Sequence, residues 1–166
     1  MMKRIIFLFL IVLPMQFVEA SKLTLEEQRN LFLVIEKSIK KTREPQFFNQ
    51  LEQLSDYPLA PYLEYQWLKK NLNQTGKIKT FIKTNEKTRY ADLLKYKWQF
   101  YLAKHKNWQE FIAQYSQSNN TKLQCYYYQA LYETGAKNKA LTGVKKIWVV
   151  GKSQPNECNP IFNKLK

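Results

Sequence analysis

The sequence predicts an all-α protein. Its 166 residues include 4 glycines but eleven tyrosines, ten phenylalanines and four tryptophans, so large side chains are abundant and flexible positions are few. Short turn-forming stretches separate segments rich in strong helix formers, and the apolar residues of these segments recur at helical spacing. No segment alternates between apolar and polar residues for long enough to predict a strand. We therefore expect about eight or nine helices joined by short turns.

Most of the predicted helices have a recognisable start or stop. Thr24-Leu25-Glu26-Glu27 has the pattern of a capping box at the start of the first helix. Pro45 suits the first turn of the second helix, because an N–H at that position would have no helical partner. Gly135 and Gly151 are expected to end two later helices in the left-handed conformation. The predicted helices cover residues 25–43, 45–54, 61–72, 77–84, 90–104, 108–115, 122–134 and 136–150, and another begins at Pro160.

The short connections predict how the helices are arranged. Consecutive helices joined by short turns pack as antiparallel neighbours. Ala130 and Ala140 lie on either side of the Gly135 turn, where small side chains let two helices approach closely. The pattern resembles the helical hairpins of tetratricopeptide repeats, although their 34-residue consensus is not met. We expect an α-solenoid or superhelix of antiparallel hairpins, with a compact helical bundle as the alternative.

Residues 1–20 have the features of a secretory signal peptide. A basic start precedes the apolar run Ile5–Val12, and Val18-Glu19-Ala20 offers a cleavage site before Ser21. The alternative is a membrane anchor, but the run is too short to cross a hydrocarbon core of roughly 30 Å. We therefore predict an exported protein whose mature part, residues 21–166, has no transmembrane span.

The chain is strongly basic, with a formal net charge of +14. Such a charge attracts anionic polymers or lipid head groups. Nucleic acid is the usual partner of a basic protein, but an exported protein rarely meets it. We expect an anionic envelope polymer as the partner, and no nucleic acid. The alternative is that the lysines only form solvated helix faces.

Cys125 and Cys158 are the only two cysteines. In an exported chain an even number of cysteines favours a disulfide. A pair of free thiols or a metal site are the alternatives, but zinc needs about four ligands. The single histidine, His105, lies at a predicted helix end, where it can interact with the helix dipole. We expect no metal and no cofactor.

Gly151-Lys152-Ser153 resembles the end of a phosphate-binding loop. That motif needs another glycine five residues before Gly151, but Lys146 occupies this position. The motif also follows a strand, whereas a predicted helix precedes it here. We interpret Gly151 as a helix cap, with Pro155 preventing the helix from continuing.

Glycoside cleavage uses carboxylic acids, so the acidic residues are the first candidates for catalysis. Most of those considered have a structural role instead. Glu27 belongs to the capping box, Asp56 precedes a turn, and Glu36 is spaced to pair with Lys40 one helical turn later. Glu64 lies beside tyrosines and is the least explained, but a single glutamate on a helix is weak support for catalysis. We predict no catalytic residue.

The run Tyr126-Tyr127-Tyr128 could offer a surface on which sugars stack. Consecutive helical residues point about 100° apart, so three in a row cannot form one flat surface. At least one must face the core, and we assign the run mainly to packing between helices.

Two long stretches of the chain resemble the soluble lytic murein transglycosylases of Gram-negative bacteria. Their order and spacing agree with that family across nearly the whole mature chain. The resemblance lies in Asp56–Tyr65 and Trp148–Cys158, and between them in Trp108, Gln124–Tyr128 and Thr134-Gly135.

The resemblance concerns only the N-terminal part of the family's superhelical ring domain. In the family, catalysis belongs to a lysozyme-like domain with Glu-Ser, Gly-Leu-Met-Gln and Ala-Tyr-Asn-Ala-Gly motifs, and residues 1–166 contain none of them. The resemblance implies a periplasmic location, association with peptidoglycan and a structural disulfide between Cys125 and Cys158. It also implies that the chain is a fragment without activity of its own.

Several functions agree with this resemblance. The first is a module, or a degenerate remnant, that associates with peptidoglycan or a protein partner. The alternatives are a component of a lytic transglycosylase whose catalytic domain is on another chain, and a structural envelope adaptor. A solenoid cut within its array leaves an apolar face uncovered, so we also expect self-association.

Overall fold

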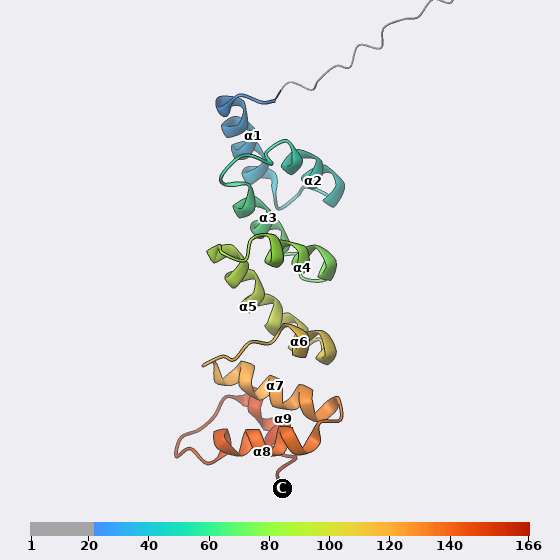
Figure 1. The fold of residues 1–166 in the computed structure, drawn as a ribbon, viewed down its shortest axis with the longest axis vertical. Coiled ribbons are helices and arrows are strands. Elements are labelled where there is room, and N and C mark those ends of the chain that lie inside the picture. The colour runs from blue at the N-terminus through green and yellow to red at the C-terminus, as the bar shows by residue number, and fades with distance from the viewer. Residues whose placement is uncertain (1–21) are drawn as a thin grey trace, which may run out of the picture.

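The computed structural model describes residues 22–166, and the predicted signal peptide lies outside this range (Figure 1). The described residues form nine α-helices, one short 3-10 helix and no strand, which confirms the all-α prediction. The elements are α1 Leu25–Ser38, α2 Glu44–Glu52, α3 Ala60–Leu68, α4 Thr75–Thr84, α5 Arg89–Lys104, α6 Trp108–Gln114, α7 Thr121–Glu133, α8 Lys137–Trp148, η1 Asn156–Cys158 and α9 Asn159–Phe162.

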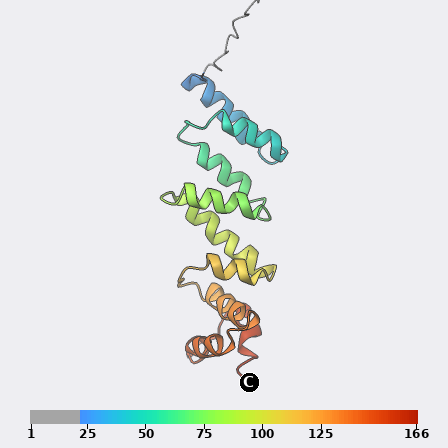
Figure 2. The ribbon, with the colours of Figure 1, turned by 45° about the vertical axis from the view of Figure 1, so that its right-hand side comes forward.

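Helices α1 to α8 follow one another along the long axis in the order of the chain, and α9 turns back to lie between the levels of α7 and α8 (Figures 1 and 2). Helix α3 packs on α1, α2, α4 and α5, and α7 packs on α5, α6, α8, η1 and α9. Counted among the α-helices alone, each described helix therefore contacts only its first and second neighbours in the chain. This is the contact pattern of a stack, in which each element is covered by the next. Closure of the stack into a superhelical ring stays a prediction.

Two hydrophobic clusters form the core of the stack. The larger one extends from α1 to α7 and includes the fully buried side chains Phe47, Phe81 and Trp98. The smaller one lies between α7, α8 and α9 and contains the two cysteines with Ala140 and Val144. Because Ala130 and Ala140 are both fully buried, α7 and α8 can approach closely on either side of their turn.

Local chemistry explains two of the helix ends. At the start of α1, the Glu27 N–H donates to Thr24 Oγ1 at 3.3 Å, and the Thr24 N–H donates to Glu27 Oε2 at 2.8 Å. This confirms the predicted capping box. Gly135, which follows α7, has a φ of 97°, in the region that favours glycine. The turn into α8 therefore depends on this glycine.

The predicted left-handed cap at Gly151 is wrong, because Gly135 is the only glycine with positive φ among the described residues. Helix α8 ends at Trp148, earlier than predicted, and Val149 takes the C-cap position. The Trp148 ring packs edge-on against Phe162 of α9, with ring centroids 4.8 Å apart. The helix therefore ends where Trp148 meets α9, and Gly151 lies beyond the position where a cap would act.

Other helix ends differ by a few residues from those predicted from the sequence. Helix α1 stops at Ser38 and not at the predicted residue 43. The Thr42 hydroxyl donates to the Ser38 carbonyl at 3.0 Å, and the Ser38 hydroxyl donates to the Ile35 carbonyl at 3.2 Å. Such side-chain bonds satisfy helix-end carbonyls and compete with further helical turns. Gly76, expected in a loop, lies in the first turn of α4.

None of the described helices combines the length and the hydrophobicity that crossing a bilayer would need.

Candidate functional site

Most of the carboxylates considered from the sequence have structural partners. The backbone and hydroxyl of Thr24 donate to Glu27 and lower the pKa of its carboxyl. Asp56 forms an ion pair with Lys22. The expected Glu36–Lys40 pair does not appear among the ion pairs of the described residues, since α1 ends before Lys40. Glu36 instead accepts a hydrogen bond of 2.9 Å from the Tyr62 hydroxyl.

Glu64 is the exception, as the sequence suggested. Its carboxyl is half-buried and lines an open pocket of about 450 Å³ between α2 and α3. Burial raises the pKa of Glu64, and the positive charge of Lys77 opposes this increase in part. The other lining residues are Phe48, Leu51, Glu52, Ser55, Ala60 and Pro61. Glu64 is the only carboxyl of the described residues whose pKa is clearly raised.

A second hollow lies between α7, α8 and the end of α6. Two adjoining cavities of about 580 and 450 Å³ share the residues Tyr127, Tyr128, Gly143 and Lys146. We call their combined space the tyrosine groove. The larger cavity is also lined by Tyr115, Gln117, Ser118, Gln124 and Ile147, and the smaller one by Asn138, Lys139 and Thr142. No acidic residue lines either cavity.

The aromatic side chains of this groove are held in place by packing. The Tyr115 and Tyr127 rings are stacked, with centroids 4.1 Å apart and planes inclined by 11°. Tyr128 is tilted against Tyr127, with centroids 5.6 Å apart. Gly143 provides the space for Tyr128, because a Cβ on this glycine would lie 2.2 Å from Tyr128 Cε1. Glycine is unfavourable inside a helix, so this close approach explains its presence in α8.

The run Tyr126–Tyr128 therefore does more than the packing role assigned to it. All three side chains are half-buried and pack against the two core clusters, in agreement with the packing role expected from the sequence. Tyr126 packs edge-on against Phe100, with ring centroids 6.3 Å apart. Tyr127 and Tyr128 line the tyrosine groove. Sequence reasoning missed this groove, and the glycine within the predicted helix 136–150 was the one signal that could have indicated it.

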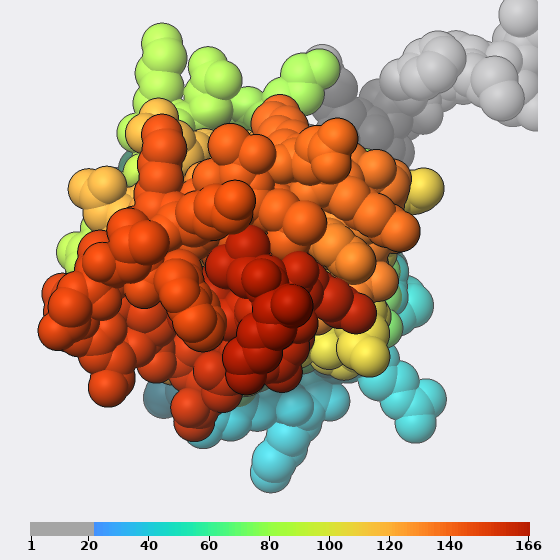
Figure 3. All heavy atoms as spheres, turned by 90° about the horizontal axis from the view of Figure 1, so that it is seen from below, coloured from blue at the N-terminus to red at the C-terminus, as the bar shows by residue number. Residues whose placement is uncertain are grey.

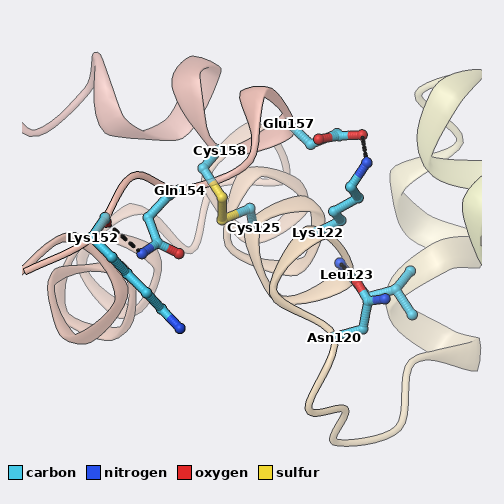
Figure 4. Close-up of a disulfide and its surroundings, with 8 residues drawn as sticks. All are labelled: Asn120, Lys122, Leu123, Cys125, Lys152, Gln154, Glu157 and Cys158. Carbon is cyan, nitrogen blue, oxygen red and sulfur yellow. Dashed lines mark hydrogen bonds and ion pairs between the residues drawn. A yellow bond between two sulfur atoms is a disulfide. The ribbon is translucent and has the colours of Figure 1, made fainter. Parts of the chain in front are cut away.

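A disulfide joins Cys125 of α7 to Cys158 of η1, with the two Cα atoms 4.9 Å apart (Figure 4). Both cysteines are fully buried. Close by, Lys122 Nζ donates to Glu157 Oε1 at 2.8 Å, and this contact lowers the pKa of Glu157. The disulfide and the ion pair both attach η1 to α7, so the segment after α8 is held against the preceding hairpin.

Metal ligands do not gather in the described part of the chain. No group of three or more histidine, cysteine or acidic residues could hold an ion there. His105 is the C-cap of α5, and its Nδ1 lies 2.8 Å from the Tyr101 carbonyl oxygen. Its ring also packs on the Tyr101 ring, with centroids 4.1 Å apart. These contacts give His105 a structural role.

The end of the stack that carries α8 and α9 exposes an apolar surface. In Figure 3, which views this end, the last residues of the chain lie against the residues of α7 and α8. Trp148, Val149 and Val150 are 46%, 76% and 42% exposed. A hollow of about 300 Å³ beside them is lined by Lys145, Trp148, Val149, Leu165 and Lys166.

Curated proteins with similar sequences come from enteric bacteria. The soluble lytic murein transglycosylase of Salmonella typhimurium is 34% identical over 143 residues, and that of Escherichia coli is 32% identical over the same length. The chain is a homologue of one part of these transglycosylases. Each match includes 84% of this chain but 22% of the relative, so the chain spans less than a quarter of their length. No protein-family profile matches the chain.

Solved structures of soluble lytic transglycosylases have the same fold over this region. The 70-kDa enzyme in complex with bulgecin A gives a TM-score of 0.72 at 31% identity, over 85% of this chain and 23% of the enzyme. An inactive mutant of the Pseudomonas aeruginosa enzyme Slt gives a TM-score of 0.69 at 30% identity, over 83% of this chain and 23% of that protein. The resemblance seen in the sequence motifs thus extends to the fold.

Proposed function

We propose that the chain is a periplasmic helical module that binds peptidoglycan and does not cleave it by itself. The observation that carries this proposal is the similarity of 84% of the chain to proteins named for their action on murein. Peptidoglycan is anionic, and the net charge of +14 favours its attraction to the chain. The apolar run within residues 1–20 supports export.

The carboxylates support the non-catalytic part of the proposal. Glu27, Glu36, Asp56 and Glu157 are engaged in a helix cap, a hydrogen bond or ion pairs. Burial raises the pKa of Glu64, but mostly apolar side chains surround it and its only acidic neighbour in the pocket, Glu52, is exposed. A pocket of this kind offers few groups to orient a sugar.

Binding can be measured by pelleting the purified mature chain with peptidoglycan sacculi at low and at high salt. We expect the chain to pellet with sacculi and to be released progressively as salt increases, because added ions screen charge-assisted binding. A chain that stays in the supernatant at low salt would contradict the proposed function. A basic protein of unrelated fold and similar charge controls for attraction by charge alone.

Catalysis can be tested separately by a zymogram on murein. We expect no lysis band from the purified chain. A clear band would overturn the non-catalytic part of the proposal. The variant Glu64→Gln would then show whether Glu64 is responsible, since it keeps the shape of the side chain and removes its acid.

The exposed apolar surface at Trp148, Val149 and Val150 favours a second candidate function, a structural adaptor that docks another protein or a second copy. Analytical ultracentrifugation over a range of concentrations tests the second copy. We expect concentration-dependent association that Val149→Ser reduces. A monomer at all concentrations would exclude self-association through this surface.

A further inference from the structure

We propose that the tyrosine groove binds a carboxylate-bearing sugar residue of a glycan strand, with the sugar ring on Tyr128 and its carboxylate at Lys146. This inference rests on the proposed function and adds to it a site and a ligand class. Three independent features of the groove support it: a fixed aromatic surface, a set of neutral hydrogen-bonding groups, and positive charge without acidic neighbours.

The aromatic surface is preorganised. Tyr128 borders both cavities, so its side chain is accessible from the open space. It packs so tightly over Gly143 that a Cβ there would lie 2.2, 2.7 and 2.9 Å from three of its atoms. Tyr127, which is itself stacked on Tyr115, is tilted against Tyr128 with ring centroids 5.6 Å apart. The negative face of such a ring attracts the weakly positive C–H groups of a sugar ring, and little entropy is lost because the side chain is already fixed.

The polar groups of the groove match a sugar as well. Gln117, Ser118 and Gln124 line one cavity, and Asn138 and Thr142 line the other. Amide and hydroxyl groups can both donate and accept hydrogen bonds, which suits sugar hydroxyl and acetamido groups. The Gln124 side chain is oriented by its own hydrogen bond, in which Nε2 donates to the Ser118 carbonyl at 2.6 Å.

The charge of the groove selects an acidic ligand. Lys146 lines both cavities and Lys139 lines the smaller one. Neither takes part in the ion pairs found between described residues, and no carboxylate lines the groove. An ammonium group without a nearby anion gains most from a ligand that brings one. A neutral glycan would contact the aromatic surface but would not pair with the ammonium groups of Lys139 and Lys146.

Helix α8 offers a matched pair of variants to test the site. Lys146→Met and Lys145→Met remove the same charge from adjacent positions, but Lys145 lines the separate hollow beside Trp148. The ligand for titration is glycan strands freed of their peptides, which expose carboxylates on alternate sugars. We expect Lys146→Met to weaken binding by about tenfold or more, as for loss of a charge-assisted hydrogen bond, and Lys145→Met by less than about twofold.

Two further variants test the aromatic surface. Tyr128→Ala removes the ring, and Gly143→Ala displaces it while leaving its chemistry intact. We expect both to weaken binding by roughly threefold to tenfold, the range for a lost aromatic contact. Thermal unfolding of each variant, followed by circular dichroism, shows whether the helices remain folded. Lys146→Arg keeps the charge and is expected to retain binding.

The outcomes separate this inference from the proposed function. If the wild-type chain does not pellet with sacculi, the proposed function fails, and the inference with it. If the wild-type chain pellets but the Lys145 and Lys146 variants bind equally well, the groove is not the site, although the proposed function stands. If strands whose carboxylates have been reduced to alcohols bind as tightly as the acidic strands, the ligand class is wrong.

Discussion

The disulfide between Cys125 and Cys158 gives the most quantitative prediction. Breaking it with a reductant changes no side chain other than the two cysteines, and both are buried among apolar residues of α7, α8 and α9. A free cysteine behaves as a small apolar residue, so both thiols remain compatible with these apolar surroundings. The main effect of reduction should therefore fall on the unfolded chain, which becomes free to explore more conformations.

The size of this effect follows from the length of the loop. The two cysteines are 33 residues apart. For such a loop the chain-entropy relation gives about 12.5 cal/mol/K, or about 3.7 kcal/mol at 25 °C. This is a large part of a total stability of about 5–15 kcal/mol. At roughly 2–4 °C per kcal/mol, the midpoint of thermal unfolding should fall by about 7–15 °C.

The assay is urea unfolding of the oxidised and the reduced chain, followed by circular dichroism. The double variant Cys125→Ala/Cys158→Ala is the control, because a reductant should not change its unfolding midpoint. Native-state hydrogen exchange adds a local test, in which protection should fall in α7–α9 and stay unchanged in α1–α4. A stability difference below about 1 kcal/mol between oxidised and reduced chain would refute the entropic reasoning.

Three further predictions concern single residues. Glu64 has a raised pKa in the folded chain, so the folded state binds its proton more tightly and stability should fall as pH rises from the unfolded pKa through the folded one. Glu64→Gln should remove this loss of stability, which can be measured as urea unfolding midpoints of both proteins at acidic and neutral pH. The same pH dependence in the variant as in the wild type would contradict the prediction. Gln99, 4% exposed, donates to the Gln114 carbonyl at 2.8 Å, so Gln99→Leu should cost about 1–3 kcal/mol in urea unfolding. Thr24→Ala should speed hydrogen exchange of the Glu27 amide roughly fivefold by removing the cap, and an unchanged rate would argue against it.

Helix positions could be predicted where the signal was local. The Thr24 capping box, Pro45 and Gly135 each act within one helical turn, and the helices next to them lie close to where they were expected. The end of α8 was misplaced because it depends on a distant contact, that of Trp148 with Phe162. Periodicity in the sequence does not show such a contact.

The partners of side chains, like the helix ends, could be predicted only where they depend on nearby residues. Glu36 has the spacing for an ion pair with Lys40, but that pair requires a helix that continues to residue 40. Since α1 stops at Ser38, Glu36 meets Tyr62 of α3 instead. The tyrosine groove combines residues from α6, α7 and α8, so only the folded chain brings them together. A disulfide between the two cysteines was favoured by their even number in an exported chain and implied by the family resemblance, while free thiols and a metal site stayed open as alternatives.

The order of the stack has a consequence for how the chain folds. Each described helix packs only on helices that are near in sequence, so no contact must wait for a distant part of the chain. Low contact order is associated with fast folding. If the chain is exported as proposed, its helices would dock one by one as they emerge, starting with α1. Oxidation of the cysteines would then be a late event that secures a hairpin already in place, and its failure would leave the earlier helices folded.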